Sequence, residues 1–399
     1  MAAVRIPANF FSIPFGLAGL SITWLAAGRG GEVPTWIGNA LLALAALAWL
    51  AVLVAYAAYV LPRPRALVGD MVDPVAGAFV SLAVITPMLL VVQGVVPYHL
   101  GVGRVLVDVF LVLTLVFGGW ITGQWIYGRI DIDQIHPGYF LPTVAGGFIA
   151  SAAASAVGQR TLADVMLGLG FVCWLVLGSL ILNRLFIRPP LPASLVPTLA
   201  IEVAPSALAV LAILARNGGR IDIWVALVSG YGLLLVLAQI RLLPLYLRLK
   251  FAPNFWALTF PWAAVATTAL HWITSREPPG QRVYTYLVLA AISALIGGIA
   301  VRSIMAAARG QSSFRRPLHR RLGDREPGSP PPATPLQPTS AAFTGSGGRH
   351  RLVTSATSVT VSTPLAKPST GPRPPRRFAA RSSVPRLTCI PSAIRRTIR

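Results

Sequence analysis

Ionisable side chains are rare inside the long apolar segments of this chain, so each of them is a candidate for chemistry. Glu202 stands in such a segment, three residues before Pro205. A carboxylate among apolar residues is costly to keep ionised, which makes it a functional candidate by default. We interpret Glu202 as a candidate pore or proton-coupling residue. The structural alternative is a carboxylate that is paired, or that reaches the interface from near the helix end.

Three acids in the first third of the chain favour structural roles. Asp108 follows Arg104 by four residues, a spacing that places both on one helix face and predicts an ion pair. Asp70 and Asp73 stand in a short loop that also carries arginines, where we expect both carboxylates to be solvated.

Patterns typical of enzymes are missing from the sequence. The five histidines are scattered, without an HExxH pattern or paired metal spacing, and no glycine-rich phosphate loop precedes a helix. The two cysteines, Cys173 and Cys389, rule out a disulfide framework and a thiolate metal site. We therefore expect no catalytic residue, no metal, no cofactor and no enzymatic activity.

Ten long apolar segments must position the candidate residues. Of the 399 residues, 55% are hydrophobic and only 12% are charged, whereas a soluble domain is typically about 25% charged. Since about 20 mostly apolar residues span a bilayer, the pattern predicts an all-α membrane protein. The expected spans are 10–27, 36–61, 74–96, 103–127, 139–158, 163–186, 197–215, 221–247, 254–274 and 282–304.

Prolines divide these spans into two kinds. Every odd-numbered span contains one, whereas the even-numbered spans lack one apart from Pro244 near the end of the eighth. Proline removes a backbone donor and kinks a helix, and in lipid the freed carbonyls need protein or a water-filled cavity as partners. The alternation predicts five helical hairpins around a central pore, with odd helices as an inner ring and even helices as an outer ring. The expected kinks are at Pro14, Pro87, Pro142, Pro205 and Pro261.

Small residues in the odd spans fit the same arrangement. The first span carries Gly16 and Gly19, and the fifth carries Gly146 and Gly147. Small residues leave room for a lumen, so we expect these four to line the pore. They equally let helices pack closely in lipid, and the sequence leaves both roles open.

The composition changes sharply after Gly310. Residues 311–399 are rich in Pro, Ser, Thr, Arg and Gly and hold 16 basic and 2 acidic residues. Such a segment cannot bury enough apolar surface to fold, so we divide the chain into a membrane domain, 1–310, and a disordered basic tail, 311–399. The tail can contact anionic lipid headgroups, and we expect no specific nucleic-acid partner.

Basic residues also indicate the orientation in the membrane. Within the membrane domain, 11 basic residues lie on the side that holds the N-terminus and 7 on the other side. Since cytoplasmic loops are enriched in Lys and Arg, we expect both termini in the cytoplasm. The first apolar run lacks a convincing cleavage site, so we expect it to be retained. Heavy use of Ala, Arg, Pro and Gly suggests a bacterium of high GC content, and hence its plasma (inner) membrane.

Four sequence motifs resemble the tellurite-resistance and dicarboxylate transporter family, to which the plant slow anion channels are related. They are FFSIPFGLAGLSITW in the first span, HPGYFLPTVAGGFIASAAA in the fifth, SGYGLLLVLAQIRLLP in the eighth and NFWALTFPWAAVATTAL in the ninth. The resemblance covers residues 8–306 and has no counterpart for the tail.

The resemblance implies a function as well as a fold. It implies a homotrimer of ten-helix protomers, each with its own pore for small inorganic or organic anions, and a link to tellurite resistance. The pore of such channels is closed by a phenylalanine of the ninth helix, which corresponds to Phe260, here followed by Pro261. The alternative within the family is a proton-coupled carrier for dicarboxylates, sulfite or tellurite.

Overall fold

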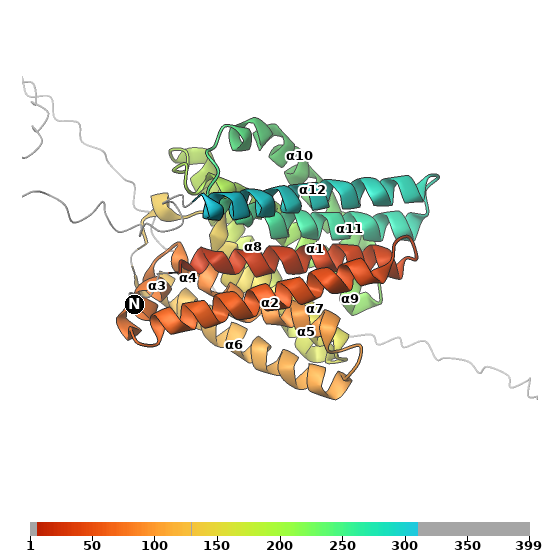
Figure 1. Cartoon of the computed structure of the whole chain (residues 1–399), viewed down its shortest axis with the longest axis horizontal. Coiled ribbons are helices and arrows are strands. Elements are labelled where there is room, and N and C mark those ends of the chain that lie inside the picture. The colour runs from red at the N-terminus through yellow and green to blue at the C-terminus, as the bar shows by residue number, and fades with distance from the viewer. Residues whose placement is uncertain (1–5, 129, 310–399) are drawn as a thin grey trace, which may run out of the picture. The chain divides into compact units, whose positions relative to one another are not determined.

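The structure, a computed structural model, describes residues 6–128 and 130–309. These residues form helices and connecting loops without a β-strand, which confirms the expected all-α membrane fold. The predicted tail, 311–399, lies outside the described residues. The long helices are α1 (Ser12–Arg29), α2 (Thr35–Val60), α5 (Leu82–Gly94), α6 (Leu100–Tyr127), α7 (Gly146–Ala156), α8 (Arg160–Ile187), α9 (Ala204–Asn217), α10 (Ile223–Leu247), α11 (Thr259–Arg276) and α12 (Gln281–Ala308), as Figure 1 shows.

The long helices fall into a buried set and an exposed set that alternate along the chain. In the spans that contain α1, α5, α7 and α9, 56–83% of the most apolar stretch is buried, against 11–22% for α2, α6, α8, α10 and α12. In α11, 8 of the 18 residues are buried and only the last three are exposed. We call α1, α5, α7, α9 and α11 the buried helices and the other five the exposed helices.

Nine segments of the described chain are long and apolar enough to cross a membrane, and α11 is not among them. This helix corresponds to the span expected at 254–274. It carries Thr259, Thr267, Thr268 and His271 among its apolar residues. A helix that is enclosed by other helices does not need a fully apolar surface, which accounts for its lower hydropathy.

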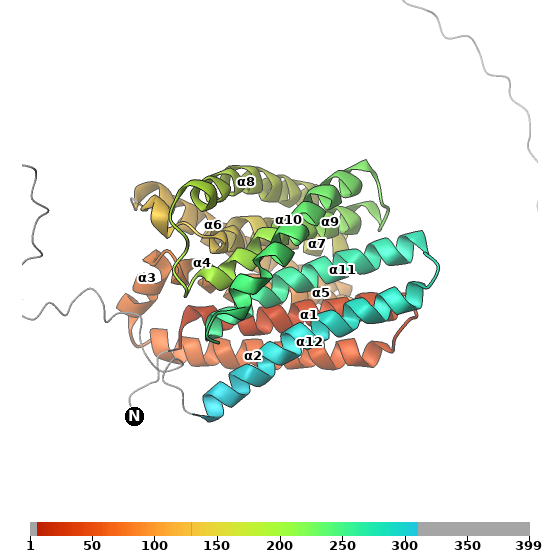
Figure 2. The same cartoon turned by 90° about the horizontal axis from the view of Figure 1, so that it is seen from above.

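Contacts between the buried helices form a closed circuit. In order around the circuit, α1 contacts α5, α5 contacts α7, α7 contacts α9, α9 contacts α11, and α11 contacts α1 again. Each buried helix also packs against the exposed helix that follows it in the chain. Figure 2 shows α1 lying next to α11, although they are far apart in the sequence.

Short segments precede the buried helices and form a second closed circuit at their N-terminal ends. These segments are η1 (Ala8–Phe11), α4 (Ala76–Val80), η3 (Pro137–Tyr139), η5 (Val196–Val203) and η6 (Pro253–Leu258). In this circuit η1 contacts α4, α4 contacts η3, η3 contacts η5, η5 contacts η6, and η6 contacts η1. Two further short helices, α3 (Pro64–Val72) and η2 (Ile132–Gln134), lie in loops.

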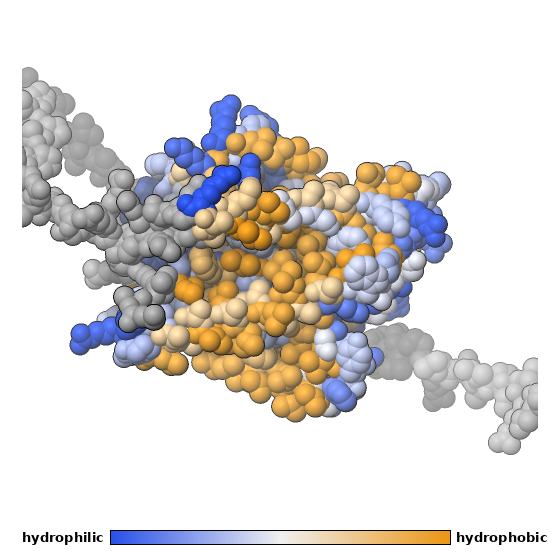
Figure 3. All heavy atoms as spheres, viewed as in Figure 1, coloured by the Kyte–Doolittle hydropathy of each residue, from blue (hydrophilic) through white to orange (hydrophobic). Residues whose placement is uncertain are grey.

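Large apolar side chains cover the exposed helices, where lipid would contact them. Figure 3 shows a broad hydrophobic surface over the helices on the side in view. On α8, for example, Val172, Leu175 and Val176 are each more than 60% exposed. Soluble proteins rarely expose so much contiguous apolar side-chain surface to water, and the exposed helices therefore form the lipid boundary.

Two expectations about acidic side chains are wrong. Asp70 is buried and accepts a hydrogen bond from the Tyr56 hydroxyl at 3.2 Å, instead of being solvated. Among the described residues Arg104 forms no ion pair with Asp108, because its Nη2 donates to the Val157 carbonyl at 2.9 Å. That bond ties α6 to the C-terminal end of α7, where a helix carbonyl lacks an intrahelical donor.

The glycines of α7 mark close contacts with exposed helices. A Cβ atom on Gly147 would stand 2.8 Å from the backbone nitrogen of Gly170 on α8. On Gly146 it would stand 2.8 Å from the Thr114 side chain on α6. Since a backbone atom cannot move aside as a flexible side chain can, the contact between Gly147 and Gly170 fixes the spacing of α7 and α8.

His136 is a buried residue in the loop that leads toward α7. Its Nδ1 accepts a hydrogen bond from the Gly138 amide at 3.1 Å, which leaves the proton on Nε2. Burial lowers the pKa of this imidazole from 6.5 to about 4, with Asp73 opposing the shift and Arg184 adding to it. The folded protein therefore keeps His136 neutral at physiological pH.

A valine at position 147 should destabilise the protein. It would collide with the α8 backbone, and overpacking of this kind typically costs about 1–3 kcal/mol. We expect a lower midpoint of thermal unfolding in detergent for Gly147→Val. Gly168→Val on α8 is the control, because a Cβ there meets nothing within 4 Å. Equal midpoints for the two variants would contradict the proposed contact.

Acidification should destabilise the fold through His136. The unfolded chain gains a proton near pH 6.5 and the folded chain only near pH 4, so stability falls as the pH drops between these values. From about pH 6.5 to about pH 5 the loss is about 2 kcal/mol. His136→Asn keeps an acceptor for the Gly138 amide and cannot titrate. We expect its unfolding midpoint to depend less on pH than that of the wild type, and an identical dependence would refute this assignment.

Candidate functional site

Two cavities lie end to end inside the circuit of buried helices. The wider one has a volume of about 190 Å³ and is lined by residues of all five buried helices. At its outer end the lining comes from the C-terminal parts of these helices, namely Arg29, Gln93, Ala156, Ala215 and His271. The five helices therefore point their C-terminal ends toward the same end of the bundle.

The narrower cavity lies toward the N-terminal ends of the buried helices. Its volume is about 20 Å³, which is room for roughly one water molecule. Its walls are almost entirely apolar and include the aromatic rings of Phe79, Phe140 and Trp256. A hydrated ion therefore does not fit on this side of the bundle in the observed conformation.

Phe260 separates the two cavities. It is one of two residues that line both of them, the other being Leu208 of α9. The Phe260 side chain is only 5% exposed, and its ring stacks on Phe15 of α1 with 3.6 Å between the ring centroids and 18° between the planes. An aromatic pair from two adjoining helices thus lies between the two cavities.

Gly19 makes room for the Phe260 ring. A Cβ atom on Gly19 would stand 3.0 Å from Phe260 Cδ2 and 2.9 Å from the Ala263 Cβ atom. Gly16, one turn earlier on α1, lies against Thr259 in the same way. The small residues on this face of α1 therefore let α11 approach closely enough for its second residue, Phe260, to reach the axis.

Hydrogen bonds hold α1 and α11 together beyond the aromatic pair. The buried hydroxyls of Thr23 and Thr267 lie 2.9 Å apart, and the Thr23 hydroxyl also lies 3.2 Å from the Ala263 carbonyl. A side-chain hydrogen bond between helices in an apolar surrounding contributes about 0.6 to 2 kcal/mol. These bonds fix the register of α11, and hence the height of Phe260.

The candidate prolines lie where the buried segments begin. Pro14, Pro205 and Pro261 stand in the first turn of α1, α9 and α11. Pro142 stands in the π-helical turn η4 (Leu141–Ala145) before α7, and Pro87 stands inside α5. A first-turn proline loses no intrahelical bond because the first amides of a helix have no partner there. Most of these prolines therefore mark the change from a tight helical turn to an α-helix.

Glu202 lies outside both cavities. Its neighbour Ile201 lines the narrower cavity, but Glu202 is in neither lining. It is 7% exposed, and its Oε1 has no hydrogen-bond partner among the described residues. The segment that holds it, η5, packs against the exposed helix α10.

The four candidate glycines have different surroundings. Gly19 lines the wider cavity. Gly16, Gly146 and Gly147 line neither cavity and lie at contacts with α11, α6 and α8, respectively.

Polar groups gather at the outer end of the wider cavity. Its polar lining residues are Arg29, Gln93, Thr267 and His271, and no acidic residue is among them. Arg29 Nη1 donates a hydrogen bond to Gln93 Oε1 at 3.0 Å. Within the described residues no three His, Cys, Asp or Glu side chains are placed to hold a metal ion.

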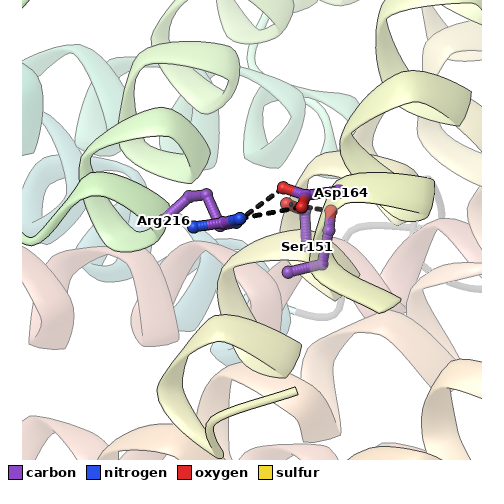
Figure 4. Close-up of polar contacts among 4 residues, drawn as sticks. Ser151, Asp164 and Arg216 are labelled. Carbon is purple, nitrogen blue, oxygen red and sulfur yellow. Dashed lines mark hydrogen bonds and ion pairs between the residues drawn. The ribbon is translucent and has the colours of Figure 1, made fainter. Parts of the chain in front are cut away.

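A nearby arginine is engaged elsewhere. Arg216, in the last turn of α9, donates from Nε and Nη2 to the two carboxylate oxygens of Asp164 on α8, at 2.5 and 2.8 Å. Figure 4 shows this bidentate pair beside Ser151, whose hydroxyl donates to the Ala163 carbonyl. The contacts join α7, α8 and α9 at the end where the wider cavity opens.

Two residues of this site, Phe15 and Arg29, were not predicted from the sequence. Phe15 stacks on Phe260, and its presence next to Pro14 in an odd span was the available signal. Arg29 was counted only as a loop charge, whereas it lines the wider cavity with Gln93. No spacing rule connects Arg29 with Gln93, because the two residues lie on different helices and are 64 positions apart in the sequence.

Comparisons with known proteins agree with this arrangement. A family model described as voltage-dependent anion channel matches residues 5–304. The chain is also 25% identical over 312 residues to a protein of Haemophilus influenzae named tellurite resistance protein TehA homolog, covering 77% of this chain and 92% of that protein. Both matches agree with the resemblance noted in the sequence motifs. The chain therefore belongs to the voltage-dependent anion channel family.

Proposed function

We propose that this protein is a membrane channel that conducts small anions along the axis of the five buried helices. The observation that carries the proposal is the pair of cavities inside the circuit of five buried helices, with Phe260 in the lining of both. Ten spans as five hairpins then surround one pore, with α11 as the ninth span. The exposed helices shield the pore from lipid.

Phe260 is the gate in this proposal. An apolar constriction blocks ions because a dehydrated ion is costly and water leaves a narrow apolar passage. Phe260 and Phe15 provide such a constriction, and the narrow cavity behind them has room for only about one water molecule. Phe260 stands at the start of α11, directly after the tight turn η6, so its ring can turn without breaking the body of the helix.

The conducted species is a small anion, which follows from the charges. Arg29 lines the wider cavity and no acidic residue does. The Haemophilus relative is named for tellurite resistance, so tellurite belongs with chloride and nitrate among the anions to be tried. A bacterial inner membrane, cytoplasmic termini and a homotrimer complete the proposal, by family likeness and by the distribution of basic residues.

A proton-coupled carrier is the second candidate, and Glu202 is the observation that favours it. The carboxyl is buried and one of its oxygens is unpartnered among the described residues, as a proton-binding group would be. Its position outside both cavities argues for the channel, because a coupling group must sense whether the site is occupied.

Phe260→Ala should open the pore. Removing the ring joins the two cavities, so the anion current of the protein in planar bilayers should rise by about tenfold or more. Phe186→Ala is the control, because Phe186 lies on α8 and is 79% exposed. An unchanged current in Phe260→Ala would remove Phe260 from the gate.

Glu202→Gln should leave anion flux intact. The residue lines neither cavity, so in the Phe260→Ala background its neutral isostere should change chloride flux into liposomes by less than about twofold, with or without a pH gradient. Flux that follows the proton gradient and disappears in Glu202→Gln would instead establish the carrier.

A further inference from the structure

The outer end of the wider cavity, called the wide cavity below, is electrostatically unfavourable for anions. This end is surrounded by the C-terminal parts of five helices. The C-terminal end of a helix carries the equivalent of about −0.5 charge through its unpaired carbonyl groups. Five such ends around one opening repel anions, so the opening needs a compensating positive charge.

Arg29 is the residue that can provide this charge. It is the last residue of α1 and the only Lys or Arg among the residues that line the wide cavity. Its side chain forms no ion pair with any residue that the structure describes. Its bond partner is the neutral amide of Gln93, so the guanidinium keeps its full charge.

Four other arginines at this end of the bundle are engaged elsewhere. Arg216 is bound to the Asp164 carboxylate and Arg282 to Glu32. Arg276 lies over the Trp272 ring, and Arg104 donates to the Val157 carbonyl. None of the four lines the wide cavity.

Gln93 determines where the guanidinium lies. It belongs to the last turn of α5, and its Oε1 accepts from one terminal nitrogen of Arg29, Nη1. An arginine has five N–H donors, so a single hydrogen bond leaves others for an anion. A glutamate at position 93 would hold the arginine equally well but would cancel its charge.

We propose that Arg29, positioned by Gln93, captures small anions at the entrance of the wide cavity and offsets the repulsion of the five helix ends. The inference rests on the proposed channel function and names the group that recognises its substrate. The site binds chloride, nitrate or a small oxyanion weakly. A single guanidinium contributes one positive charge, and the open cavity does not surround the bound anion. Weak binding suits conduction, since the ion must also leave.

The conductance test uses the Phe260→Ala protein, in which current is measurable without a gating stimulus. Adding Arg29→Gln should lower chloride current entering from the Arg29 side by about threefold or more at low salt. The difference should shrink at about 1 M salt, where the Debye length is only about 3 Å. Arg29→Lys should keep most of the current, and Gln93→Glu should reduce it as Arg29→Gln does. Arg160→Gln is the control, an exposed arginine at the start of α8 at the same end.

A binding measurement separates capture from conduction. Chloride NMR line broadening by the detergent-solubilised wild type should fall in Arg29→Gln and stay unchanged in Arg160→Gln. If broadening falls but Phe260→Ala carries no current, the capture site stands and the proposed channel fails. If Phe260→Ala conducts and Arg29→Gln alters neither current nor broadening more than Arg160→Gln does, the capture site is overturned.

Discussion

Closure of the bundle between α1 and α11 is the constraint on which the rest of the structure depends. The two helices are separated by about 240 residues in the chain, yet the circuit of buried helices exists only if they meet. Gly16 and Gly19 remove the side chains that would keep them apart, and the hydroxyls of Thr23 and Thr267 set their register. In lipid, where apolar burial does not distinguish one helix from another, such close packing and hydrogen bonding decide which helices pair.

The position of Phe260 between the two cavities is a consequence of the same contact. Because α1 and α11 approach at glycine, the Phe260 ring fits between Gly19 and Phe15. An aromatic ring held by packing alone costs little to displace, whereas a salt bridge at this place would need its charges to be separated in an apolar surrounding. In the proposed channel, a neutral obstruction also leaves no fixed charge to bind a passing anion. The packing of α1 against α11 that completes the circuit of buried helices is thus compatible with opening of the proposed pore.

Much of the fold could be predicted from composition and proline spacing. Run length and the scarcity of charge identify the spans, and the alternation of prolines separates the buried helices from the exposed ones. The tight turns before these helices could not be predicted, because a proline near the start of a helix and one that kinks its middle look alike in sequence. Asp70 was misjudged because its partner Tyr56 lies in the preceding helix and no local pattern connects them.

The candidate site was predictable only in part, for a related reason. Phe260 came from a resemblance of motifs and not from spacing, since a single phenylalanine in an apolar helix is usually a packing residue. Which glycine faces the axis also depends on helix rotation: Gly19 lines the wide cavity whereas Gly147 faces α8. A pattern of small residues specifies that helices approach closely, but tertiary contacts determine whether that approach makes a wall or a lumen.

Helix direction connects the fold to the choice of ion. Each buried helix is followed by an exposed helix that runs in the opposite direction. The five buried helices therefore all point the same way, and their dipoles add at both ends of the bundle. The N-terminal ends favour anions and the C-terminal ends oppose them. An anion channel with this topology therefore needs positive side chains at one end only. In the proposed channel Arg29, held by Gln93 at the wider cavity, meets that requirement, and no basic residue lines the narrower cavity at the other end.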